Sequence, residues 1–173
     1  MKGRKILIAL LIILTIPLAV SASELIHKSL LEALEAKRYL SPDFESEMES
    51  EIFDLINHER NIRLLESLER DPTLDLVAEM HSKDMAKKHY FSHFDFLGHG
   101  VRDRLERTDK FCVFLGENLA YNSHKLFGSE ERMDGLMNSP SHRGGILNPQ
   151  YLEVGLSVEK GLENFYLTQV FCG

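Results

Sequence analysis

The sequence predicts an α+β fold in which helices cover an antiparallel sheet. Two observations carry this prediction. Before residue 90, apolar side chains recur near the 3.6-residue period of amphipathic helices. From Leu152 to Val158 they instead alternate with polar ones, and a second apolar run at 165–172 follows a turn at 160–164. Two such runs around a short turn are typical of an antiparallel hairpin.

Residues 1–22 have the features of a secretory signal. Lys2, Arg4 and Lys5 precede an apolar run at 6–20, and small residues follow it. The run is shorter than the roughly 20 residues of a bilayer-spanning helix, which favours cleavage after Ala22. An uncleaved N-terminal membrane anchor is the alternative. We expect a secreted or extracytoplasmic protein that touches a membrane only through this segment, if it stays uncleaved.

The charge of the rest of the chain limits its possible partners, and its length limits the number of domains. Removing residues 1–22 takes away three positive charges and changes the formal net charge from −7 to −10. No basic face offsets this charge, which argues against nucleic acid or an anionic membrane as an electrostatic partner. About 150 residues suit one domain with a real core. We expect an N-terminal helix and linker at 23–45 and the main domain at 46–173.

Three helices are expected in the first half. Residues 24–40 form an amphipathic pattern. Ser41 and Pro42, and again Asp71 and Pro72, have the pattern of a cap followed by proline in the first turn, so each pair predicts a helix start. The second helix carries a stripe of apolar residues, namely Phe44, Met48, Ile52, Leu55, Ile56 and Ile62. His81 lies on the buried stripe of the third helix and is expected to be a hydrogen-bonded core histidine.

The middle of the chain mixes loops with short elements. Residues 89–100 contain three histidines and two glycines and predict a loop, followed by a short helix at 101–107. Residues 111–115 are apolar and predict a buried strand, after which Gly116 lets the chain turn and places Glu117 at the strand edge. A helix at 128–139 is expected to end before Pro140.

Ser141 is expected to cap a new helical turn that projects His142 from a constrained backbone. Elsewhere, Cys112 and Cys172 suit an exported chain in which thiols oxidise, and a bond between them would close a loop of about 60 residues. We favour this disulfide. Two buried free thiols are the alternative.

Three side chains at separate points of the chain suggest a metal site. His93, Glu117 and His142 each lie at the end of an expected element. Two neutral imidazoles and a carboxylate suit a divalent cation such as zinc, with positions left for water. Such an ion acidifies its water and supports hydrolysis.

Five motifs occur in an order that resembles the CAP superfamily of cysteine-rich secretory proteins, antigen 5 and pathogenesis-related proteins, also called SCP-like domains. The chain is most similar to the prokaryotic branch, over about residues 50–173. The motifs are Asn57-His58-Glu59-Arg60, the run from Ala78 to Ala86, Tyr90-Phe91-Ser92-His93, Gly116-Glu117-Asn118-Leu119-Ala120 and Met137-Asn138-Ser139-Pro140-Ser141-His142-Arg143.

The resemblance implies a three-layer α-β-α sandwich with a central antiparallel sheet. It also implies a cleft with two histidines and two acids that binds a divalent cation in some members. His93, Glu117 and His142 match three of these residues. The second glutamate has no match, because Leu136 takes the place of the usual tryptophan and Ser139 that of the acid; Asp134 or Glu131 on the same helix are the substitutes.

Three functions remain open. In the first, the domain is an envelope-associated binding module for an envelope component, a lipid-like ligand or a protein partner. In the second, it is a metal-dependent, peptidase-like hydrolase in which Glu117 binds the ion or acts as general base; Ser139 or Ser141 with a histidine is a metal-free variant. In the third, a buried polar network has no ligand. The cleft residues of the first reading are His93, Glu117, Asn118, Ser139, His142 and Arg143. The network of the third reading consists of Glu117, Asn118, His142 and Arg143.

Overall fold

The computed structural model describes residues 22–123, 128–162 and 164–173. The predicted secretory signal lies almost entirely outside these residues. The chain divides into two compact units, one up to Leu40 and one from Ser41 to Gly173. The boundary falls five residues before the start expected for the main domain at residue 46.

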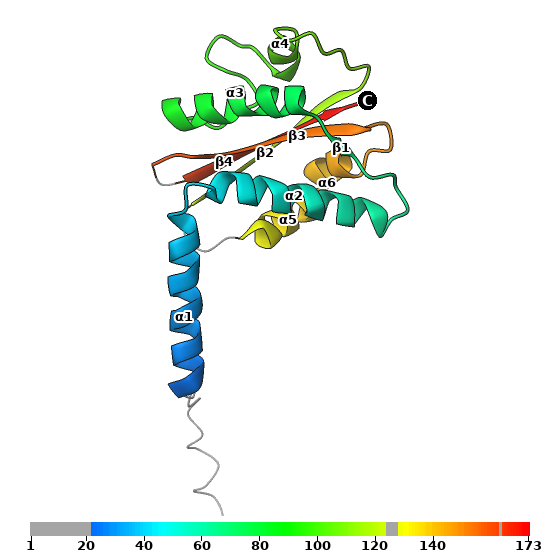
Figure 1. Cartoon of the computed structure of the whole chain (residues 1–173). Coiled ribbons are helices and arrows are strands. Elements are labelled where there is room, and N and C mark those ends of the chain that lie inside the picture. Colours follow the sequence, from blue (N-terminus) through cyan, green and yellow to red (C-terminus); the bar gives the residue numbers. More distant parts are fainter. Residues whose placement is uncertain (1–21, 124–127, 163) are drawn as a thin grey trace, which may run out of the picture. The chain divides into compact units, whose positions relative to one another are not determined.

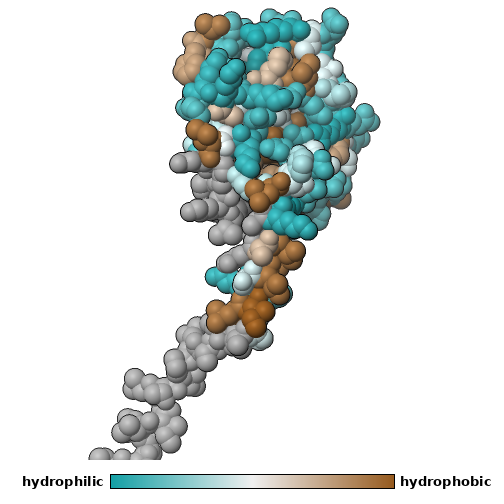
Figure 2. Space-filling view, turned by 60° about the vertical axis from the view of Figure 1, so that its left-hand side comes forward, coloured by the Kyte–Doolittle hydropathy of each residue, from teal (hydrophilic) through white to brown (hydrophobic). Residues whose placement is uncertain are grey.

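The first unit contains helix α1 (Ala22–Tyr39). Its apolar side chains are exposed and gather in the strip of brown surface in Figure 2, and they are Leu25, Ile26, Leu30, Leu31 and Leu34. Charged residues such as Glu24, Lys28 and Lys37 occupy other positions of this sequence, which makes the pattern amphipathic. Within the described ranges, no helix combines the length and apolar character needed to cross a bilayer.

The second unit is built on a sheet of four strands in the order β1-β3-β4-β2. Strands β3 (Glu153–Lys160), β4 (Asn164–Cys172) and β2 (Leu115–Ser123) are antiparallel neighbours, whereas the two-residue β1 (Glu69–Arg70) pairs with β3 in parallel. Helices lie on both faces, with α3 and α4 on one side and α2, α5 and α6 on the other (Figure 1). The predicted α+β sandwich is confirmed, with one parallel pair that the sequence analysis did not anticipate.

Both faces of the hairpin strands are buried. The alternating pattern predicted one buried face for β3, but every residue from Val154 to Val158 is buried. The polar residues of the alternation, such as Ser157, contact the α3 layer, where the Ser82 hydroxyl donates to the Ser157 carbonyl and to Thr168 Oγ1. A sheet covered on both sides leaves no solvent face, which is why the prediction was wrong.

Helix α2 (Phe44–Asn61) packs on β3 and α5. It begins two residues later than the Ser41-Pro42 pair predicted, because the Ser41 hydroxyl accepts from the Asp43 amide in a turn ahead of the helix. Its buried face contains Phe44, Met48, Ile52 and Ile56 as expected, but Ile62 is exposed and the last buried position belongs to Arg60.

Helix α3 (Pro72–Lys88) begins as predicted. The Asp71 carboxylate accepts from the Leu74 amide at 2.8 Å, and Pro72 occupies the first turn. His81 on its buried face is 1% exposed, and its Nε2 lies 2.8 Å from the Ser92 carbonyl oxygen. His81 is therefore the hydrogen-bonded core histidine that the stripe predicted.

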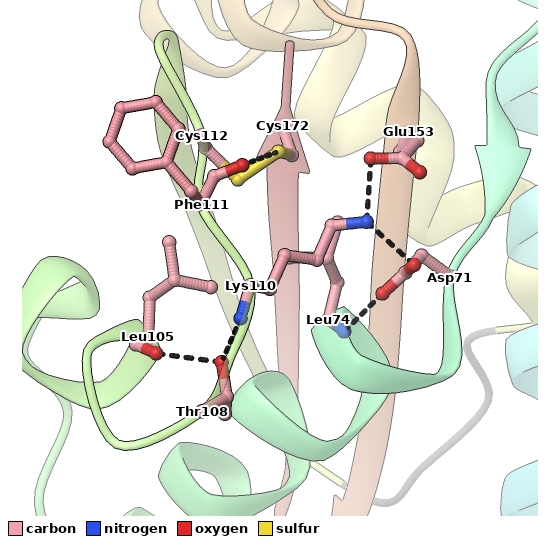
Figure 3. The surroundings of a disulfide bond; sticks show 9 residues. All are labelled: Asp71, Leu74, Leu105, Thr108, Lys110, Phe111, Cys112, Glu153 and Cys172. Atoms are coloured by element: carbon pink, nitrogen blue, oxygen red, sulfur yellow. Dashed lines mark hydrogen bonds and ion pairs between the residues drawn. A yellow bond between two sulfur atoms is a disulfide. The ribbon is translucent and has the colours of Figure 1, made fainter.

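Residues 111–115 are not a buried strand. Phe111 is 80% exposed and Val113 is 66% exposed, and the strand β2 begins only at Leu115. Cys112 is buried and forms the predicted disulfide with Cys172 (Figure 3). This crosslink holds an exposed apolar segment against the end of β4, so hydrophobicity at this point does not indicate a strand.

Salt bridges lie beside the disulfide. The Lys110 ammonium group contacts Asp71 Oδ2 at 2.6 Å and Glu153 Oε2 at 2.7 Å (Figure 3). These contacts join the segment before Cys112 to the start of α3 and to β3. The end of the chain is fixed by the backbone as well, because Phe114 and Gly173 exchange two hydrogen bonds.

Gly116 and Glu117 lie within β2, although the sequence predicted a turn at this point. Gly116 is needed for close packing, since a Cβ there would lie 2.2 Å from the Tyr151 hydroxyl oxygen. Tyr151 in turn stacks on Phe171 of β4 with ring centroids 5.3 Å apart. The glycine therefore admits a tyrosine side chain and does not end the strand.

Two helices precede the hairpin. Helix α5 (Ser129–Asn138) ends before Pro140 as predicted. Earlier in the chain, α4 (Val101–Leu105) lies within the short helix expected at residues 101–107. Helix α6 (Pro140–Ile146) has Ser139, not Ser141, at its N-cap position, and the Ser139 side chain makes no capping bond. The proline itself starts the helix, because its fixed φ suits the first helical position.

Candidate functional site

The predicted site residue Glu117 lies on β2, an outer strand of the sheet. Its side chain is only 3% exposed. One carboxylate oxygen, Oε1, lies 2.8 Å from His93 Nδ1, and the other, Oε2, accepts from the Arg104 guanidinium group. The structure therefore brings His93 and Glu117 together, as the sequence analysis expected, and adds Arg104 as a third member.

Arg104 of α4 connects the loop at 89–100 to the sheet. Its side chain is 4% exposed and forms an ion pair with Glu117. A second nitrogen, Nη1, donates to the carbonyl oxygen of His99 at 3.2 Å and approaches that of His93 at 3.5 Å. One guanidinium group thus holds the carboxylate and the loop that carries His93.

His81 lies next to this cluster. Burial lowers the pKa of His81, the charge of Arg104 lowers it further, and the charge of Glu117 partly opposes these effects. Its Nδ1 and the Nε of Arg104 are buried, and neither has a hydrogen-bond partner among the described residues. The interior below His93 is therefore polar as well as closely packed.

His142 belongs to the other side of β2. Its backbone carbonyl accepts from Asn118 Nδ2 at 3.0 Å, and the same amide donates to Gln169 Oε1 of β4 at 3.1 Å. Gly145 of α6 approaches Asn118 so closely that a Cβ would lie 3.0 Å from Oδ1. Asn118 therefore positions α6, and with it the His142 side chain, against the sheet.

His93 influences the titration of His142. Burial lowers the pKa of His142, and the electrostatic effect of His93 lowers it further. The His93 side chain is 52% exposed. The site thus presents two imidazoles near the surface, with Glu117 and Arg104 buried beneath one of them.

The remaining predicted residues lie further out. Ser139 and Ser141 place their hydroxyl oxygens 3.1 Å apart on the exposed surface at the start of α6. The exposed Arg143 donates to the Met137 carbonyl oxygen at 2.9 Å. No contact in the described part of the chain joins Ser139 or Ser141 to a histidine, so the geometry gives no support to a serine nucleophile.

The proposed substitutes for the second glutamate, Glu131 and Asp134, are exposed on α5. Over the described ranges, no group of three or more histidine, cysteine or carboxylate side chains could hold a metal ion. The set His93, Glu117 and His142 does not fit as three direct ligands, because both Glu117 oxygens are already engaged. The two imidazoles remain as candidate metal-binding groups. Glu117 contacts the His93 ring in the way that a carboxylate outside the ligand set orients a metal-binding histidine.

The sequence analysis missed Arg104 and a pair of aromatic rings. Phe91 and Tyr121 are 48% and 42% exposed, and their ring centroids lie 5.5 Å apart. Tyr121 follows Glu117 by four residues on β2 and so faces the same side of the sheet. If residues 115–123 had been recognised as a strand, the alternation of its side chains would have placed Tyr121 on the same face as Glu117. Nothing in the sequence singled out Arg104.

Two relatives come from Bacillus subtilis (strain 168). The chain is 36% identical over 123 residues to the "uncharacterized membrane protein YlbC", covering 71% of this chain and 34% of that protein. It is 33% identical over 122 residues to the "uncharacterized protein YkwD", covering 70% of this chain and 46% of that protein. The chain therefore spans less than half the length of either relative.

A solved structure is also similar to this chain. The crystal structure of an extracellular protein containing an SCP domain from Bacillus anthracis str. Ames superposes with a TM-score of 0.68 at 34% identity, covering 77% of this chain and 44% of the other. The model of the cysteine-rich secretory protein family, CAP, matches residues 53–171. These residues include β2, α6 and the hairpin that frame the site, and the chain belongs to the CAP family.

Proposed function

We propose that the domain is an extracytoplasmic binding module whose cleft, at the edge of β2, binds its ligand through His93 and His142. The observation that carries this proposal is the engagement of Glu117. Its two oxygens contact His93 and Arg104, and the side chain is 3% exposed. The groups left to meet a ligand are the imidazoles, with the aromatic pair Phe91 and Tyr121 on the neighbouring surface.

A divalent cation such as zinc is the first ligand to test. Neutral imidazole is a common zinc ligand, and His93 keeps Nε2 available because Nδ1 faces Glu117. The lowered pKa of His142 keeps its ring neutral at physiological pH. Two protein donors leave coordination positions for an envelope component, a lipid-like molecule or a partner protein. In this arrangement the ion supplies the attachment point, and Glu117 orients His93.

The hydrolase alternative is less well supported by this geometry. It requires Glu117 to bind the ion or to accept a proton as general base. Both tasks require an accessible oxygen, and a general base must come within hydrogen-bond distance of the proton it removes. Burial and the contacts with His93 and Arg104 keep Glu117 from either task unless the cluster rearranges.

The test is zinc titration by calorimetry with three proteins. The wild type is expected to bind zinc saturably at about one site, and His93→Ala/His142→Ala is expected to abolish binding. His27→Ala/His58→Ala removes two exposed imidazoles elsewhere and serves as the matched control with unchanged affinity. Glu117→Gln is expected to weaken zinc binding by about 10- to 100-fold, as the loss of an outer partner does. Equal zinc binding by all the proteins, or none by the wild type, would contradict the imidazole pair as a cation site.

A further inference from the structure

A concave surface lies along the edge of β3 that faces away from β4 and β2. It is a groove of about 620 Å³ between α2, α3 and β3. In Figure 1, α2 and α3 lie on opposite faces of the sheet, and β3 lies on the β1 side of the strand order. The groove is separate from the histidine site at β2, since strand β4 lies between β3 and β2. None of the proposed cleft residues lines it.

Two backbone amides of this edge already have side-chain partners. β1 pairs with β3 only at Glu153 and Val154. Beyond that point Asp75 Oδ1 accepts from the Leu156 amide at 2.8 Å, and Glu49 Oε1 accepts from the Val158 amide at 2.9 Å. Carboxylates that occupy the amide groups of an edge strand oppose the addition of another strand. A ligand in the groove is therefore recognised by side chains and not by extension of the sheet.

The groove carries more negative than positive charge. Its lining includes five carboxylates and two cations, which gives a formal charge of −3. Arg70 pairs with Glu49 and Asp75, and Lys83 pairs with Glu79. Both cations are thus in use. Glu45 and Glu159 remain, and within the described ranges neither forms an ion pair.

Glu159 shows how poorly this charge is compensated. Its carboxyl group is subject to the negative charges of Glu45 and Glu49 of α2 and Glu79 of α3. Burial raises the pKa of Glu159, the three neighbouring carboxylates raise it further, and Lys83 only partly opposes this effect. A cation entering the groove relieves the repulsion among these carboxylates, which makes its binding favourable.

Apolar surface adjoins the charge. Leu76 is 48% exposed at the groove, whereas the side chains of Leu156 and Val158 beneath it are buried. A lysine side chain suits such a surface, because its aliphatic stem packs on apolar atoms while its ammonium group meets a carboxylate. The net charge of −7 also draws a basic partner towards the domain.

We propose that the groove along β3 binds a lysine-rich, extended segment of a partner protein, whose ammonium groups pair with Glu45 and Glu159. The groove is an interaction surface independent of the histidine cleft. The carboxylates spread along β3 and the exposed Leu76 together favour a peptide over a single metal ion.

The test uses the purified full-length chain and a fluorescein-labelled peptide of sequence Lys-Ala-Lys-Ala-Lys, blocked at both ends, in an anisotropy titration. Saturable binding that weakens as salt rises is expected. Glu45→Gln/Glu159→Gln is expected to weaken binding by at least about tenfold, equivalent to about 1.4 kcal/mol. The matched control Glu106→Gln/Asp109→Asn removes the same charge from exposed positions around the end of α4 and should keep the wild-type affinity.

Three results would overturn the proposal. Equal affinity in the wild type and the Glu45→Gln/Glu159→Gln protein would show that these carboxylates do not bind the peptide. An equal loss in both charge variants would show attraction to the net charge alone. Displacement of the peptide by spermidine at equal concentration would show a polyamine site. Since His93→Ala/His142→Ala should leave peptide binding unchanged, failure here and failure of the cleft are distinguishable.

Discussion

Arg104 and Glu117 form an ion pair whose side chains are only 4% and 3% exposed. The pair joins α4 to β2, and through the carbonyl oxygens of His93 and His99 it also holds the loop at 89–100. A buried pair is stabilising only as a pair, because either partner alone is a desolvated charge. The position of His93 therefore depends on Arg104, a residue that is itself buried.

Replacing Arg104 alone should lower the free energy of unfolding more than replacing both Arg104 and Glu117. Arg104→Met leaves Glu117 buried without its counter-charge, and we expect a loss of about 3–5 kcal/mol in the free energy of unfolding. Arg104→Met/Glu117→Gln should recover part of this loss. Urea unfolding of the four proteins in this double-mutant cycle measures the coupling. Additive losses would show that the two side chains act independently.

Gly155 of β3 packs directly on the backbone of α3. A Cβ at Gly155 would lie 2.0 Å from the carbonyl carbon of Leu74, where neither backbone gives way easily. Gly155→Ala is therefore expected to destabilise the domain by about 3 kcal/mol or more.

The matched control is Gly144→Ala in α6, where an added Cβ meets nothing within 4 Å. This change should stabilise the domain by up to about 1 kcal/mol, since alanine favours a helix over glycine. Thermal unfolding of both variants distinguishes them by the sign of the change in Tm. A neutral Gly155→Ala would mean that β3 and α3 separate readily.

Arg60 of α2 fixes the connection between α6 and β3. Its guanidinium group donates to the carbonyl oxygens of Glu66, Ile146, Asn148 and Tyr151. Arg60→Met leaves these acceptors without the donor, and a loss of about 3 kcal/mol or more is expected from several unpaired groups. Arg63→Met, at a side chain that is 42% exposed, should change the free energy of unfolding by less than about 0.5 kcal/mol. Similar values for the two in urea would contradict this role of Arg60.

His81 should make the domain less stable in mild acid. Burial lowers its pKa below the ordinary value of 6.5, so below pH 6.5 the unfolded chain takes up a proton that the folded domain does not. The contribution of His81 is complete above pH 6.5 and is lost as pH falls towards its folded pKa, at up to about 1.4 kcal/mol per pH unit.

Urea unfolding of the wild type and His81→Asn at pH 7 and pH 5.5 tests this dependence. The variant is expected to be less stable at pH 7 but to lose less stability between the two pH values. His142, whose pKa burial also lowers, contributes equally in both proteins and cancels in the comparison. An identical pH dependence would exclude His81 as the cause.

The disulfide between Cys112 and Cys172 closes a loop with a sequence separation of 60 residues. In the chain-entropy model such a crosslink stabilises the folded state by about 4 kcal/mol. Cys112→Ala/Cys172→Ala should lose most of this stability while keeping the far-ultraviolet circular dichroism of the folded domain at low temperature. An unchanged urea midpoint would show that the salt bridges of Lys110 and the backbone bonds of Phe114 suffice.

Much of the fold was predictable because it depends on local chemistry. Asp71 caps α3, Pro140 separates α5 from α6, and the alternation after Pro149 forms a hairpin. His93 and Glu117 were expected in one site because the ordered motifs resemble a family in which they meet, and the structure shows them in contact. Their spacing of 24 residues would not have revealed this by itself.

The sequence by itself determined the helices of the main domain, the closing hairpin and the candidate side chains, since capping and hydrophobic period act over a few residues. Only the tertiary structure decided the partners of buried charges. Arg60 donates to carbonyl groups some 90 residues away in the chain, and Arg104 forms an ion pair with Glu117. The physical reason is that a charge is buried only where distant groups converge to satisfy it, and that convergence is a property of the packed chain.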